Sequence, residues 1–234
     1  LDSDGTLTLS AVRIDNLGGT LSSAGDLRVS ASGALSNAGG YLLTDAALRL
    51  RSAGLDNREG RIAAKGALDL GTGAVDNTRG HLTAGGRLDL VAGALTNTAG
   101  RIASAGPLAL SASGLLQPGG ELFSQRALTL DLHGGDLDND DGLIRAPDAL
   151  VLQHLGAVRN RGGEIASAAG FELAATALDN AQGRLLSEAG LALRIDGRLG
   201  NAHGLISASR LALAAGRLDN AGGTLHARGE LGLT

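Results

Sequence analysis

The 234-residue sequence predicts an all-β fold, a parallel β-helix of about eleven coils of 19–22 residues with three short strands in each coil. Three observations predict this fold. A side-chain amide, almost always that of Asn, returns at a nearly constant interval along the whole chain. A glycine follows each amide three residues later, and aliphatic residues recur at fixed positions, two residues apart, around them.

The amide is the natural origin of each repeat because it marks the same point in every coil. Successive origins are separated by 21, 20, 20, 20, 20, 22, 21, 20, 21 and 19 residues. The chain begins and ends within a repeat, so we expect residues 1–234 to be a single β-helix segment from a longer array. The origins are Asn16, Asn37, Asn57, Asn77, Asn97, Gln117, Asn139, Asn160, Asn180, Asn201 and Asn220.

The aliphatic pattern within a repeat predicts the strands. In the third repeat, Ile62 and the small Ala64 are two residues apart, as are Leu68 and Leu70, and Val75 comes two residues before the next Asn. A spacing of two places side chains on one face of a strand. Glycine-rich corners separate segments that are too short for a stable helix. Each repeat therefore closes into one coil, and its aliphatic side chains stack on those of the neighbouring coils.

The composition fits such a core and excludes several other classes of protein. Glycine occupies 38 positions, Tyr and Phe together only 3, and Cys, Met and Trp are absent. An apolar fraction of 43% with a net charge of −4 argues against disorder and against nucleic-acid binding. No apolar stretch is long enough to span a membrane, and no leader begins the chain, so we expect any export signal to lie outside it. No residue pattern predicts a cofactor.

A column of stacked amides is the structural role that we predict for the origins. An amide both donates and accepts hydrogen bonds, so identical amides one coil apart can bond along the axis. Asn also tolerates the left-handed backbone of a tight corner. Gln117 keeps the amide on a longer arm, and the adjacent Pro118 lacks a backbone donor, so we expect that coil to be irregular.

The amino-acid sequence of the repeat resembles that of a known family. The segments "IDNLGGTL" (14–21) and "LDNAGGTL" (218–225), each followed by small residues and a Gly-x-Leu-x-Leu stretch, are similar to the repeats of filamentous haemagglutinin and of contact-dependent inhibition exoproteins. The resemblance covers essentially the whole chain. It implies a right-handed coil and export through a dedicated outer-membrane pore by two-partner secretion. The absence of cysteine suits passage through an oxidising periplasm.

The function that this resemblance implies is a structural and adhesive rod, secreted and displayed on the bacterial surface, which extends a distal binding or toxin domain from the cell. A dedicated module for a host receptor or glycan on the rod face is the first alternative. A β-helix polysaccharide lyase or hydrolase is the second, but it needs catalytic groups held in a cleft, and no coil here carries an insertion able to build one. We therefore predict no enzyme. We also expect end-to-end association through the end coils.

An acidic run within "GGDLDNDDG" is the first candidate site. It resembles a calcium loop, but the spacing fails the EF-hand pattern, since the twelfth position is Pro147 and not Glu. A solvated corner is the favoured interpretation, and no metal site is predicted. The residues concerned are Asp136, Asp138, Asp140 and Asp141.

A short basic stripe is the second candidate site. Arg61, His81 and Arg101 each lie four residues after their origin, so we expect them to stack on one outward face, where they would suit a sulfated sugar or a phosphate. Glu121 ends the stripe, and ordinary charged surface is the competing interpretation. The five histidines fall in different registers and share no obvious meeting point, so they predict no histidine cluster; they are His81, His133, His154, His203 and His226.

The aromatic residues and one long corner complete the candidates. Tyr41 and Phe123 are expected outside and Phe171 inside the core. The gap from Leu130 to Leu137 is seven residues, against five or six elsewhere, which predicts that residues 117–141 form the most deviant coil, with "HGGDLDNDD" bulging from one edge.

Overall fold

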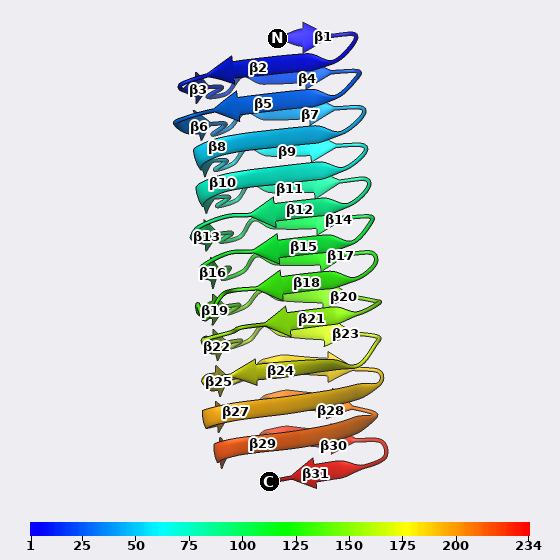
Figure 1. The fold of residues 1–234 in the computed structure, drawn as a ribbon. Coiled ribbons are helices and arrows are strands. Elements are labelled where there is room, and N and C mark those ends of the chain that lie inside the picture. The colour runs from blue at the N-terminus through cyan, green and yellow to red at the C-terminus, as the bar shows by residue number, and fades with distance from the viewer.

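The computed structural model describes all residues, 1–234, as a straight stack of coils without any helix (Figure 1). All strand pairings are parallel and join each coil to the next, so the predicted parallel β-helix is confirmed. One sheet contains 12 strands, which gives about twelve turns when the partial N-terminal turn is counted with the eleven that carry an amide origin. The near arms run from right to left and the far arms from left to right as the chain descends, which makes the coil right-handed.

The first sheet, called sheet A here, contains one short strand from each turn. These strands begin four residues after the amide, and each pairs in register with its equivalent in the next coil. They are β1 (Asp2–Ser3), β4 (Thr20–Ser23), β7 (Tyr41–Thr44), β9 (Arg61–Ala64), β11 (His81–Ala84), β14 (Arg101–Ser104), β17 (Glu121–Ser124), β20 (Leu143–Ala146), β23 (Glu164–Ser167), β26 (Arg184–Ser187), β28 (Leu205–Ala208) and β30 (Thr224–Ala227).

The Leu-x-Leu segments form a second arm and the Leu-x-Asn segments a third. The second arm comprises β2 (Leu7–Ala11), β5 (Leu27–Ala31), β12 (Leu88–Val91), β15 (Leu108–Ser111), β18 (Leu128–Asp131), β21 (Leu150–Gln153), β24 (Phe171–Ala175) and β31 (Leu231–Leu233). The third comprises β3 (Ile14–Asp15), β6 (Ala34–Ser36), β13 (Leu95–Thr96), β16 (Leu115–Leu116), β19 (Leu137–Asp138), β22 (Ala157–Arg159) and β25 (Ala177–Asp179).

Four coils depart from the three-strand expectation because their second and third arms run on as one strand. In the best matched pair, β8 and β10, the backbones pair in register from Leu48 with Leu68 to Asp56 with Asp76, with Ala53 and Gly73 as the one unpaired position. The continuous strands are β8 (Leu48–Asp56), β10 (Leu68–Asp76), β27 (Gly190–Gly200) and β29 (Arg210–Asp219).

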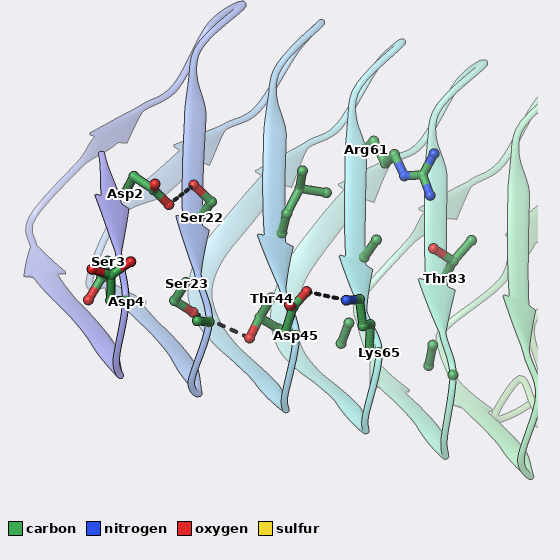
Figure 2. A pocket seen from close by; sticks show the side chains of 16 residues that line it. Asp2, Ser3, Asp4, Ser22, Ser23, Thr44, Asp45, Arg61, Lys65 and Thr83 are labelled. Atoms are coloured by element: carbon green, nitrogen blue, oxygen red, sulfur yellow. Dashed lines mark hydrogen bonds and ion pairs between the residues drawn. The ribbon is translucent and has the colours of Figure 1, made fainter.

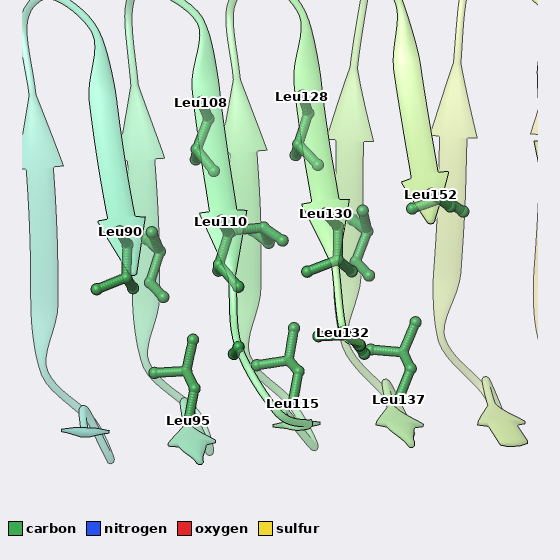
Figure 3. Close-up of a cluster of buried hydrophobic side chains, with 14 of the residues drawn as sticks. Leu90, Leu95, Leu108, Leu110, Leu115, Leu128, Leu130, Leu132, Leu137 and Leu152 are labelled. Atoms are coloured by element: carbon green, nitrogen blue, oxygen red, sulfur yellow. The ribbon is translucent and has the colours of Figure 1, made fainter. Parts of the chain in front are cut away.

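The core is a set of aliphatic columns that run along the axis, as Figure 3 shows for the middle of the rod. Leu90, Leu110 and Leu130 stack in one column and Leu95, Leu115 and Leu137 in another, and all six are at most 2% exposed. Fully aliphatic columns need no aromatic residue, because each side chain packs on one of the same shape in the next coil.

The second arm contributes a further inward position that the Leu-x-Leu pattern did not predict. It lies two residues after the second Leu, where Ala112 and Leu132 are fully buried and Ile195 nearly so. Leu132 lies inside the long gap from Leu130 to Leu137. The predicted bulge of residues 133–141 is wrong for its second half, because Leu137 and Asn139 are buried in the core columns, and the exposed part of the corner is limited to residues 133–136.

The corner at each amide has one repeated backbone geometry. The residue two places after the amide has a positive φ in every coil, from Gly18 (60°) to Gly222 (62°), although Arg79, Ala99 and His203 show that glycine is not required there. Glycine is required at the next position. A Cβ on Gly80 would lie 2.1 Å from the backbone oxygen of Asn57 in the coil before. The invariant glycine therefore lets adjacent corners touch.

Candidate functional site

The amides form a single column of hydrogen bonds inside the rod. Each side-chain nitrogen donates to the side-chain oxygen of the next coil, for example Asn57 to Asn77 at 2.6 Å and Asn77 to Asn97 at 2.7 Å. The column passes through Gln117, which accepts from Asn97 at 3.0 Å and donates to Asn139 at 2.9 Å. All its members between Asn37 and Asn201 have no exposed surface, so the ladder is fully shielded from water.

The Asp that precedes many of these amides has a role that the sequence did not reveal. Its carboxylate accepts the backbone N–H two residues later, as Asp76 does from Thr78 at 3.0 Å and Asp179 from Ala181 at 3.1 Å. This Asx turn holds the entry to the corner. The guanidinium of Arg58 hydrogen-bonds to the equivalent Asp56 and lowers the pKa of that carboxyl.

The basic stripe lies on the outer face of sheet A. His81 pairs in register with Arg61 on one side and Arg101 on the other, and Tyr41 precedes Arg61 in the same row. Partial desolvation and the two arginine charges lower the pKa of His81, which favours the neutral form of its ring. Glu121 follows Arg101 and forms an ion pair with it, which neutralises that end of the row.

A hollow of about 660 Å³ lies beside this row over β1, β4, β7, β9 and β11 (Figure 2). Arg61 is the only member of the stripe that lines it. Lys65 is paired with Asp45 across the hollow at 2.8 Å, whereas Arg61 makes no ion pair. The other polar lining groups are hydroxyls and carboxylates, Ser22, Ser23, Thr44, Thr83, Asp2 and Asp4 among them, and Leu43 and several alanines form the rest of the wall. The hollow thus combines an apolar wall with polar groups of both charges, and it is not a uniformly basic surface.

Two aromatic rings also lie on the face of sheet A. Tyr41 is 46% exposed. Phe123 points outward as expected, but it is half-buried and shares a row with Ala103, which is only 7% exposed. Phe171 replaces a core Leu and is buried.

Three carboxylates of the acidic run already contact other groups of the protein. Asp136 accepts the backbone N–H of Ala157 at 2.8 Å, and Asp140 that of Arg161 at 2.9 Å. Asp138 pairs with Arg159. Asp141 lies at the positive-φ position of its corner, with φ of 54°. These carboxylates fix the corner to the next coil, and no group of three His, Asp or Glu side chains anywhere in the chain is arranged to hold a metal ion.

The expectation that the histidines share no meeting point is wrong for two of them. The rings of His133 and His154 are stacked, with centroids 6.5 Å apart and planes inclined by 9°. Both Nδ1 atoms face the same oxygen of Asp131, at 3.5 Å from His133 and 2.9 Å from His154. Counted from the preceding amide the two differ in register, because the first coil is longer. Counted back from the next amide, each lies six residues before it, at Asn139 and Asn160.

The histidine pair stands on the long corner. Leu132 to Gly135 form a tight turn, closed by the N–H of Gly135 donating to the oxygen of Leu132 at 2.8 Å. Both central residues have positive φ, 52° at His133 and 90° at Gly134, as a type I′ turn demands. The N–H of Gly134 then donates to the oxygen of His154 in the next coil. The corner is therefore ordered by hydrogen bonds.

The comparisons with known proteins agree with this architecture. The family model of the haemagglutinin repeat matches residues 1–39, 36–92, 90–203 and 189–234, which together span the chain. No curated protein matches the chain, and no solved structure does. The structure has no helix that is able to cross a membrane.

Proposed function

Because the chain belongs to the haemagglutinin-repeat family, we propose that it is a rod segment of a large secreted adhesin, displayed on the bacterial surface, that extends a distal binding or toxin domain from the cell. The proposal rests on the continuity of the core along the rod. The aliphatic columns and the amide ladder pass through every complete coil, and the strand pairings join each coil only to its neighbours. Such a stack transmits a fixed direction over its whole length.

The test is to lengthen the rod by whole coils. A second copy of residues 16–219, placed after residue 219 in the full-length protein, keeps the register and adds ten coils, or about 48 Å. Electron micrographs of the purified protein should show this increase. The control is the same insertion with Gly80→Ala and Gly100→Ala, which prevents those corners from touching and should not extend the rod by the full amount. An unchanged length with the unaltered insertion contradicts the proposal.

Export through an outer-membrane pore is part of the same proposal. Each emerging coil buries its aliphatic rung on the coil before, and this burial favours outward movement without a nucleotide. We expect the Gly80→Ala, Gly100→Ala chain to be released into the medium less than the unaltered chain and to accumulate with the cells. Equal release of both chains would remove folding as the driving force.

A glycan or receptor site on sheet A is the second candidate, supported by the unpaired Arg61 beside a hydroxyl-lined hollow. Arg61→Ala should abolish binding on a glycan array, whereas Arg101→Ala, which removes a guanidinium already paired with Glu121, should not. An anionic ligand beside His81 would also raise the pKa of its ring, measured by NMR. If no glycan is bound by the unaltered chain, this second function is refuted.

A further inference from the structure

We propose that His133 and His154 form a two-histidine site for a divalent transition-metal ion of the zinc or copper type, which would clamp two adjacent coils at the widest corner of the rod. The starting observation is that two imidazoles from successive coils lie parallel, 6.5 Å apart, on the outer surface. Imidazole is the side chain that these ions most readily accept.

The orientation of the rings is the second observation. His154 Nδ1 is 2.9 Å from Asp131 Oδ1, and His133 Nδ1 also faces that oxygen. His154 Nδ1 is within hydrogen-bond distance of the carboxylate, and when its N–H donates there, the Nε2 atom of that ring carries the lone pair. A carboxylate behind the distal N–H is the usual outer support of a metal-bound histidine. Asp131 gives this support to His154, and His133 Nδ1 lies 3.5 Å from the same oxygen.

The two Nε2 atoms differ in what they contact. His133 Nε2 is 2.7 Å from the hydroxyl of Ser111, which can donate to it or rotate away. His154 Nε2 has no protein partner, and the two imidazole side chains are 59% and 67% exposed. Ligand bonds of about 2.0–2.1 Å require the Nε2 atoms to approach within about 4 Å, so the outer edges of the rings must tilt toward each other. The exposure of both side chains leaves space for this tilt, and water would complete the coordination shell.

The place of the pair gives the ion a structural effect. The main chains of the two coils are already joined here by the hydrogen bond from Gly134 N–H to His154 O. One coil further on, the second arm is interrupted, because β21 pairs with β18 but has no register pairing with β24. A metal bound to both histidines would tie the coils together next to this interruption.

The experiment is a calorimetric titration of the chain with zinc chloride at pH 7.5, after dialysis against EDTA. We expect one ion per chain, binding that is lost at pH 5.5 because the imidazoles must be deprotonated, and a higher melting temperature with zinc. His133→Gln and His154→Gln should each weaken binding by at least about tenfold, and Asp131→Asn by about tenfold through loss of ring orientation. The matched control is His203→Gln, since His203 also has a positive φ but no histidine partner.

Circular dichroism establishes that each variant keeps the fold. The NMR signals of the two imidazoles provide a second readout, since zinc should shift these and leave those of His81, His203 and His226 in place. No saturable binding by the unaltered chain, or binding that survives in the His133→Gln, His154→Gln double variant, overturns the proposal. Binding that is insensitive to Asp131→Asn overturns the orienting role assigned to the carboxylate.

Discussion

Replacing Asn77 by Asp tests the amide ladder directly, because the change removes one donor and almost no volume. Asn77 has no exposed surface, accepts from Asn57 at 2.6 Å and donates to Asn97 Oδ1 at 2.7 Å. An aspartate keeps the first bond and loses the second. Its carboxylate then faces the Asn97 oxygen at hydrogen-bond distance without a proton between them.

The cost follows from the groups left without partners. Gly80 O also loses a contact, but it still accepts the backbone N–H of Arg101 at 2.9 Å. Asn97 Oδ1 becomes an unsatisfied buried acceptor, which costs about 1–3 kcal/mol. The buried, uncompensated carboxylate raises the total to about 3–5 kcal/mol at pH 7.

The penalty should depend on pH with a definite sign. Burial raises the pKa of the introduced carboxyl in the folded state above its unfolded value of about 3.9. The penalty is therefore fully present above the folded pKa and is lost as the pH falls toward the unfolded one, where the protonated carboxyl donates to Asn97. The difference between the Asn77→Asp variant and the unaltered chain should shrink from pH 7 to pH 4.

Urea unfolding followed by far-ultraviolet circular dichroism measures this difference, since the chain has no Trp. Asp76→Asn is the control. Asp76 is half-exposed, and an Asn there still accepts from the Thr78 N–H, so we expect a change within about 0.5 kcal/mol. Equal losses for the two variants, or a loss from Asn77→Asp that does not vary with pH, would refute the buried ladder as a source of stability.

Three further changes test other parts of the coil by the same unfolding measurement. Gly80→Ala places a Cβ 2.1 Å from Asn57 O and should destabilise the rod by more than about 3 kcal/mol, whereas a smaller loss would mean that the corners separate easily. Ala99→Gly relieves an exposed residue with φ of 49° and should stabilise by about 0.5–1 kcal/mol; no gain would show that this corner carries no backbone strain. The pKa of His81 is lower in the folded chain than in the unfolded chain, so the unfolded chain binds a proton more readily and the folded chain loses stability as the pH falls from 7 to 5. His81→Gln removes this group and should therefore reduce that loss of stability. An identical loss with and without His81 would contradict that reasoning.

The coil could be predicted from the sequence because its determinants repeat. Val75, Asn77 and Gly80 each stand in a column of equivalents, and a spacing of two fixes which side chains point inward. The further inward position was missed because Ser52 and Thr72 occupy it in some coils and hide the pattern. The Asx turn of Asp76 could not be predicted from the repeat, since a carboxylate that accepts a neighbouring N–H has no periodic signal of its own.

The candidate sites were less predictable because they depend on single departures from the repeat. Arg61, His81 and Arg101 each lie four residues after an amide, so their common row was expected. Which arginine forms an ion pair depends on the position of a single glutamate, Glu121, which pairs with Arg101. The pairing of His133 with His154 was hidden by the 22-residue coil, which displaces offsets counted from one side only. Insertions therefore limit prediction more than substitutions do.

The amide ladder also gives the rod an electrical polarity. Every side-chain oxygen faces the preceding coil and every nitrogen the following one, so the amide dipoles point the same way from Asn16 to Asn220. Reversing one amide would set oxygen against oxygen on one side and nitrogen against nitrogen on the other, so the dipoles keep a common direction. Any further coil that joins the column must continue this direction. Two such rods can extend the column only head to tail, because stacking in the opposite sense would bring like ends of the amide chain together.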